Sequence, residues 1–247
     1  MMTDTRLTEM AFSTKNKEKI MEYENLNLEN TNCATLAGEV VGEISVSHQI
    51  EGENFIEFAV KVNRLSGSAD IIPVTISERT LLGQKIEAKK FVRVTGEYRS
   101  YNKLCSEKSK LILHLFAKEF ELFDEEVENE NEVKLTGFLC KEPVYRKTPF
   151  NREICDILLA VNRTNYHKSD YIPCILWGRN ARFMASQNVG CKIEIVGRIQ
   201  SREYSKTLVD GLVENKTAYE VSCQRISMCK NISNIKEKEQ DEDVVNN

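Results

Sequence analysis

Apolar and polar residues alternate along several short stretches of this chain. Between residues 57 and 62, Phe58, Val60 and Val62 occupy every second position, and the residues between them are polar or small. The same alternation places isoleucine at 193, 195 and 199. A period of two is typical of a β-strand with one face toward a core and the other toward water.

The second half of the chain reads as five short strands. The strands are expected over residues 133–140, 154–162, 170–177, 192–200 and 218–226. A basic turn lies between the first two, and a short helix is expected over residues 179–187. Five strands with one helix between the third and fourth is the pattern of an OB-fold barrel.

The first half repeats the signals of the second. An apolar stretch reaches a glycine (Gly38, Gly137), V-N-R follows (62–64, 161–163), then D-x-I-P (70–73, 170–173), then a second stretch with glycine (Gly96, Gly197). The offsets of 99, 99, 100 and 101 residues indicate a tandem duplication. The fold class predicted is therefore all-β, with two tandem OB-fold barrels, each of five strands with one short helix.

Charge divides the chain further. Residues 124–132, DEEVENENE, hold six carboxylates and are expected to form an acidic linker. The net charge of −4 alone argues weakly against a nucleic-acid partner, but residues 133–226 hold 15 Lys and Arg against nine Asp and Glu. The predicted organisation is a disordered extension (1–32), a degenerate OB-fold (33–123), the linker (124–132), a DNA-binding OB-fold (133–228) and a disordered acidic tail (229–247).

Several classes of protein are excluded or disfavoured. None of the eight cysteines has a metal-binding spacing, so reduced core cysteines are expected. The three histidines lie in no catalytic arrangement, and we expect neither enzyme activity, nor a metal, nor a cofactor. No apolar run is long enough for a membrane span and no signal peptide is visible, which predicts a cytoplasmic protein.

Aromatic residues occupy positions that the second barrel does not need for its core. In the strand at 170–177, Ile172, Cys174 and Leu176 form one face, and Tyr171, Pro173, Ile175 and Trp177 form the other. Both faces are apolar, so the face with the rings is either covered by a neighbour or exposed to bind something with flat apolar surfaces. If the strand at 192–200 runs on, its polar face carries three further residues of interest. They are Arg198, Arg202 and Tyr204.

The second half resembles the bacterial single-stranded DNA-binding proteins of the OB-fold type. The resemblance is carried by KLTG, LLAVNR, YIPCILWG and GRIQSREY in the family's order and spacing, and it covers nearly all of residues 132–226 and, more loosely, 34–120. It implies that Tyr171, Trp177 and Tyr204 stack on bases. Stacking on such rings tolerates any sequence, because every base has a flat π-face.

Basic residues surround these rings. The candidates for phosphate contact are Arg146, Lys147, Arg152, Arg163, Lys168, Arg179, Arg198 and Arg202. Each candidate also has a plainer interpretation: the basic turn could be a solvated loop, Trp177 a barrel-edge ring and Tyr204 a packed loop residue. Phe150, at the tip of the turn, is either a staple for the loop or a fourth stacking ring.

The first copy lacks the family's rings. Ile71, Ser77 and Lys103 stand where the second copy has Tyr171, Trp177 and Tyr204, which favours a structural role. The family assembles several barrels around the strand, so we expect a homodimer with four barrels. The tail DEDVVNN is acidic but ends in asparagine, which leaves its recruitment of replication or repair proteins in doubt. The predicted function is coating of single-stranded DNA; an OB-fold assembly module and an RNA-binding protein remain alternatives.

Overall fold

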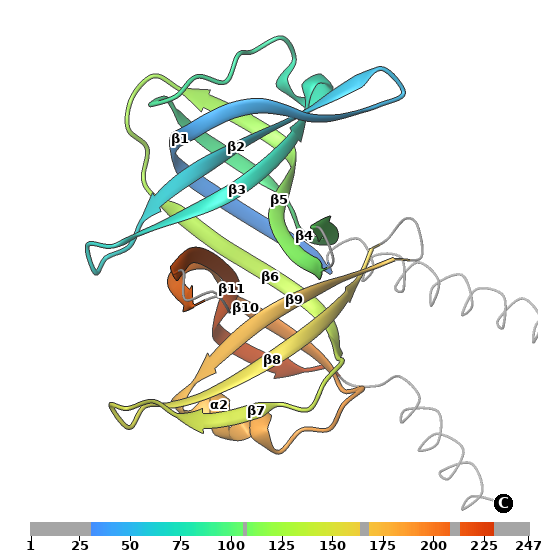
Figure 1. Cartoon of the computed structure of the whole chain (residues 1–247), viewed down its shortest axis with the longest axis vertical. Helices are drawn as coiled ribbons and strands as arrows, with labels where there is room; N and C mark the ends of the chain where they lie inside the picture. Colours follow the sequence, from blue (N-terminus) through green and yellow to red (C-terminus); the bar gives the residue numbers. More distant parts are fainter. Residues whose placement is uncertain (1–30, 106–107, 164–167, 208–212, 230–247) are drawn as a thin grey trace, which may run out of the picture.

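The computed structural model describes residues 31–105, 108–163, 168–207 and 213–229 (Figure 1). Most of the predicted N-terminal extension and of the predicted acidic tail therefore lies outside the described residues. The described residues form two β-barrels, one above the other in Figure 1, which confirms the predicted fold class.

The first barrel is closed by five strands. They are β1 (Asn32–Ile50), β2 (Glu53–Asn63), β3 (Ala69–Ser77), β4 (Phe91–Cys105) and β5 (Lys108–Phe123). Antiparallel pairs join β1 to β2, β2 to β3, β4 to β5 and β4 to β1, and a short parallel pairing of β3 with β5 completes the ring. This is the order of pairing that an OB-fold requires.

The second barrel repeats this arrangement. Its strands are β6 (Glu130–Leu139), β8 (Glu153–Asn162), β9 (Ser169–Trp177), β10 (Lys192–Thr207) and β11 (Val213–Met228), with α2 (Gly178–Ala185) between β9 and β10. A further short strand, β7 (Val144–Lys147), pairs with β8 at the edge, inside the stretch that the sequence predicted to be a basic turn.

The helix of the first barrel is smaller than expected. In place of an α-helix, a single 3-10 turn, η1 (Glu78–Leu81), follows β3. Leu82 adopts φ 50° and Gly83 φ 84°, so the backbone turns left-handed after one turn and the helix cannot continue.

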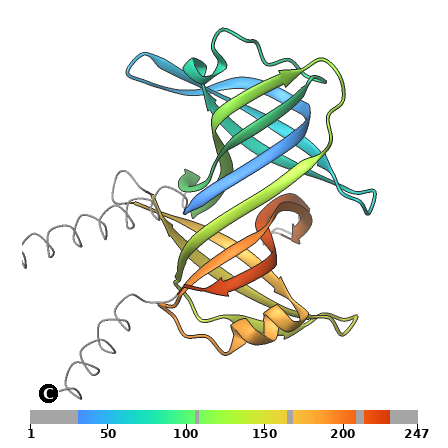
Figure 2. The same ribbon diagram turned by 180° about the vertical axis from the view of Figure 1, so that it is seen from behind.

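One sheet runs through both barrels. β1 pairs antiparallel with β6 from Asn32↔Leu135 to Ala37↔Glu130, and the two strands lie side by side in Figure 2. Glu130, Asn131 and Glu132 therefore belong to a strand, and the acidic connection is shorter than the 124–132 linker that the charge pattern indicated. The two barrels are therefore joined by the β1–β6 pairing in addition to the covalent chain.

The core follows the predicted alternation. In the second barrel the inward residues of β8, β9 and β10 are at most 5% exposed: Ile157, Leu159, Val161, Ile172, Cys174, Leu176, Ile193, Ile195 and Ile199. The repeated glycines lie within their strands, as in the strands expected over residues 133–140 and 192–200. A Cβ at Gly137 would overlap the carbonyl oxygen of Ala160, and one at Gly197 that of Ser222, so these positions let strands cross closely. No helix among the described residues is long and apolar enough to cross a membrane.

Candidate nucleic-acid interface

Two rings stand on the outer face of β9. Tyr171 is 46% exposed and Trp177 39% exposed, while the residues between them that face inward are buried. The indole Nε1 of Trp177 donates a hydrogen bond to Ser222 Oγ on β11 (3.3 Å), which orients the ring against the barrel wall. Two exposed rings on one strand face form a surface on which bases can stack.

Tyr204 lies on the long hairpin formed by β10 and β11. Its ring is 39% exposed, and the guanidinium carbon of Arg202 lies 5.8 Å from the ring centroid. The strand runs on past Gln200, as the sequence allowed, so Arg202 and Tyr204 share one side of the hairpin. Ser201 points to the other side, toward the first barrel.

The repeated V-N-R and D-x-I-P motifs form the contact between the barrels. Asp170 is completely buried, and its Oδ1 accepts hydrogen bonds from Arg163 Nη2 (2.7 Å) and from the backbone N–H of Ser100 on β4 (2.6 Å). Ser100 Oγ in turn accepts the backbone N–H of Tyr171 (2.7 Å). The β4–β5 hairpin of the first barrel is thereby attached to β9 of the second barrel.

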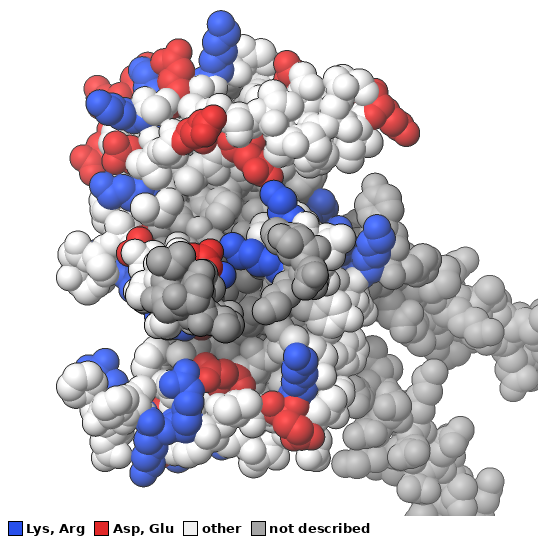
Figure 3. Space-filling model, in the orientation of Figure 1, with Lys and Arg blue, Asp and Glu red and all other residues white. Residues whose placement is uncertain are grey.

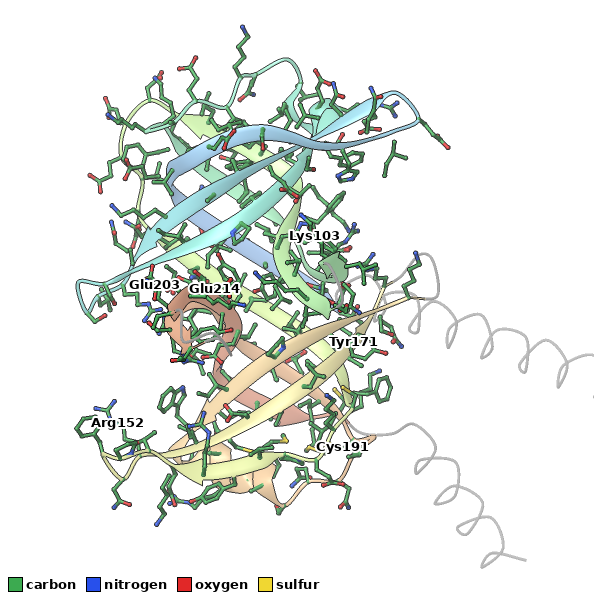
Figure 4. The ribbon with its side chains drawn as sticks, in the orientation of Figure 1. Lys103, Arg152, Tyr171, Cys191, Glu203 and Glu214 are labelled. Carbon is green, nitrogen blue, oxygen red and sulfur yellow. The ribbon has the colours of Figure 1, made fainter. Side chains whose placement is uncertain are left out.

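The same contact occurs with the barrels exchanged. Asp70 Oδ1 accepts the backbone N–H of Ser201 on β10 (2.7 Å), and Ser201 Oγ accepts the N–H of Ile71 (3.1 Å). Arg64 Nε and Arg198 Nη1 donate to Asp70 Oδ2 (2.7 and 3.0 Å). The β4–β5 hairpin of the first barrel therefore contacts β9, and the β10–β11 hairpin of the second barrel contacts β3 (Figure 4).

Two of the predicted phosphate-contacting residues lie in this contact. Arg163 is paired with Asp170 and Arg198 with Asp70, and both carboxylates are at most 1% exposed. A guanidinium already neutralised by a buried carboxylate attracts a phosphate much less than a free one does. The sequence missed Asp70, Asp170, Ser100 and Ser201 as contact residues, although the duplicated D-x-I-P motif was the signal that marked the two aspartates.

The basic turn leads to an exposed tip. Phe150 is 87% exposed, and Arg152 lies at the far end of this hairpin, away from the rest of the second barrel (Figure 4). Arg146 Nε pairs with Asp156 Oδ2 (2.8 Å), while Lys147 is exposed. In Figure 3, Lys and Arg side chains gather over this part of the second barrel.

The remaining two cations lie apart from each other. Lys168 is exposed, and its carbonyl oxygen accepts the N–H of Arg163 (2.8 Å). Arg179 lines a groove of about 530 Å³ with Lys134, Glu132 and Glu194, on the surface of β6, β10 and β11. The structure therefore places Tyr171 and Trp177 near the two ends of the same face of β9. It distributes the predicted cations over the hairpins, the barrel contact and a separate groove.

Comparison with known proteins agrees with this geometry. Residues 130–229 match the model of the Single-strand binding protein family. Over 80 residues the chain is 38% identical to single-stranded DNA-binding protein 1 of Lactococcus lactis and 38% identical to single-stranded DNA-binding protein A of Bacillus subtilis. These alignments cover 30% of this chain and 53% and 46% of the two relatives, so the chain spans about half the length of the curated relatives it matches.

A solved structure matches over both barrels. The single-stranded DNA-binding protein from Thermus aquaticus superposes with a TM-score of 0.63 and 18% identity, over 81% of this chain and 93% of that one. At this identity the likeness shows a shared fold. In sequence, the second barrel, residues 130–229, is similar to the single-strand binding protein family.

Proposed function

We propose that this protein binds single-stranded DNA with little sequence preference and protects it in the cytoplasm during replication, recombination or repair. The observation that carries the proposal is the pair of exposed rings, Tyr171 and Trp177, on the outer face of a barrel that matches the single-strand binding family. Each stacked base contributes about 1–3 kcal/mol irrespective of its identity.

Cations on the second barrel supply attraction for the backbone. Tyr204 and Phe150 extend the stacking surface, and the phosphate contacts come from the cations that lie outside both the barrel contact and the face assigned below to a second copy, where Arg179 lies: Arg146, Lys147, Arg152, Lys168 and Arg202. Arg163 and Arg198 act indirectly, by fixing the position of β9 and of the β10–β11 hairpin. Because phosphate contacts release counterions, affinity falls steeply with salt.

The fluorescence of Trp177 tests the proposal, because it is the single tryptophan of the chain. Titration with oligo-dT at low salt should quench it saturably, and the apparent affinity should fall as salt rises. Unchanged fluorescence without binding would favour a protein-assembly module. Tighter binding of oligo-U than of oligo-dT would favour an RNA partner, which ring stacking alone does not exclude.

We also propose that the chain forms a homodimer, which presents four barrels to one strand. The sheet face of β4, β1, β6 and β10 is the surface we assign to the second copy, since it runs unbroken across both barrels. A groove of about 310 Å³ on this face is lined by Cys33, Thr35, Glu130, Glu132 and Lys134. Sedimentation at micromolar concentration should give twice the 28.4 kDa chain mass, and a monomer would overturn this part of the proposal.

A further inference from the structure

The first barrel has its own set of aromatic residues, on different strands from those of the second. Its β3 offers only Ile71 and Ser77 at the ring positions, but one side of the β4–β5 hairpin carries Tyr101 and His114, and Phe116 continues β5. Tyr101 occupies the hairpin position that Arg202 holds in the second barrel. The first barrel therefore has aromatic residues on β4 and β5, whereas it has none at the ring positions of β3.

Contacts among these residues leave one ring presented to solvent. The Tyr101 and His114 rings meet edge to face with centroids 5.5 Å apart, and His114 Nδ1 lies 2.5 Å from Thr75 Oγ1 on β3. Phe116 is covered by the guanidinium of Arg99, 3.9 Å from its centroid. Tyr101 packs against His114 and is 41% exposed, so its ring is available for stacking.

A groove lies beside this ring. Its volume is about 240 Å³, and the residues that line it include Ala59 and Pro73 as well as the carboxylates Glu43 and Glu57. These carboxylates repel phosphate but can accept hydrogen bonds from the N–H groups of a base. Burial and the charge of Glu57 raise the pKa of Tyr101 above its usual value, so its phenol is neutral at physiological pH, as that of an ordinary tyrosine is. The groove thus fits a planar neutral base better than a phosphate.

Two lysines stand next to the groove toward the tip of the hairpin. Lys103 on β4 lies directly opposite Lys110 on β5, and both are exposed on the side that carries Tyr101. Like charges at directly opposite positions destabilise a sheet unless an anion lies between them. Among the described residues neither lysine has an ion-pair partner.

We propose that the first barrel holds a second nucleobase-binding groove, in which Tyr101 stacks on a base and Lys103 and Lys110 hold the adjoining phosphates. The proposal rests on the single-stranded DNA binding proposed above and extends it to the barrel that the sequence assigned a structural role. One strand would then pass from the rings of β9 in the second barrel to Tyr101 in the first. Lys103 lies between the barrels, above Tyr171 in the view of Figure 4.

A relocated tryptophan tests the site directly. In the double variant Trp177→Phe, Tyr101→Trp, the new tryptophan is the single one in the chain and reports on the groove. We expect saturable quenching on addition of oligo-dT of about 30 nucleotides, roughly twice the longest footprint of one OB-fold. Binding is followed independently by the anisotropy of a labelled oligonucleotide. Binding without any change at the new tryptophan would overturn the proposal.

Single substitutions keep the test decisive should the double variant fail to fold. Tyr101→Ala should weaken binding of the 30-nucleotide strand roughly tenfold, and Tyr101→Phe should restore it, since stacking needs no hydroxyl. Phe183→Ala, which removes a 41% exposed ring from α2, is the matched control and should leave affinity unchanged. Equal affinity of Tyr101→Ala and the wild type would contradict the groove, whereas failure of the wild type to bind DNA would contradict the proposed function itself.

Discussion

At the scale of single residues, two buried aspartates determine how the barrels meet. Asp170 orders Arg163 and the backbone of Ser100, and Asp70 orders Arg64, Arg198 and the backbone of Ser201. Each carboxylate has its oxygens occupied by charged or backbone donors, which is the condition for a buried charge to be tolerated.

Removing one of these charges should destabilise the protein. In Asp170→Asn the guanidinium of Arg163, 22% exposed, loses its counter-ion, and we expect the free energy of unfolding to fall by about 3 kcal/mol. Asp156→Asn, which breaks the exposed pair with Arg146, is the control and should cost less than about 1 kcal/mol. Urea denaturation measures both, and equal small effects would show that the buried pair does not hold the barrels together.

Tyr98 carries a buried polar group, its hydroxyl, with no hydrogen-bond partner among the described residues. Burial raises the pKa of this hydroxyl well above the usual range. Since an unsatisfied buried hydroxyl costs about 1–3 kcal/mol, Tyr98→Phe should raise the free energy of unfolding by about 1 kcal/mol. A loss of stability in that variant would mean that the hydroxyl has a partner, such as a buried water.

Residue-level prediction from the sequence succeeded where the signal was local. Alternation placed Ile193, Ile195 and Ile199 in the core. In the strand of Tyr171 and Trp177 both faces are apolar, and the family resemblance was needed to identify these two as exposed rings. Neither signal could show that Arg198 meets Asp70, because the two are 128 residues apart and lie in different barrels. A lone arginine beside a ring looks the same in sequence whether it contacts a phosphate or a buried carboxylate.

At the scale of elements, the two long hairpins were the least predictable parts. The sequence indicated that β10 would reach about Gln200, but the strand continues to Thr207. The outer half of the β10–β11 hairpin is mostly polar on both sides, so periodicity carries little signal there. What holds the two hairpins is contact with the other barrel, through Ser100 and Ser201.

The stability of the protein should depend on pH through His114, on the β4–β5 hairpin. Burial, with the nearby charge of Arg99, lowers the pKa of His114 to about 4, whereas an unfolded histidine titrates near pH 6.5. Between these values the unfolded chain binds a proton that the folded chain does not, so stability falls as pH drops from about 6.5 to 4. His114→Gln should lose less stability than the wild type between pH 7 and pH 5 in urea denaturation. Equal losses would show that other groups cause the decline.

At the scale of the whole molecule, the pairing of β1 with β6 and the exchanged hairpins make one body of two barrels. The duplication was evident in the sequence, but the exchange was not, because it depends on where each hairpin points after leaving its barrel. The duplicated V-N-R and D-x-I-P motifs serve this shared contact, which explains why both copies keep them while their rings differ.

The central claim is that the exposed rings of β9 stack on single-stranded DNA, and the affinity of Trp177→Ala for labelled oligo-dT tests it most directly. Fluorescence anisotropy at fixed salt should show binding weakened roughly tenfold relative to the wild type, since a stacked base contributes about 1–3 kcal/mol. The Phe183→Ala control should bind as the wild type does. Unchanged affinity in a folded Trp177→Ala protein would contradict the claim.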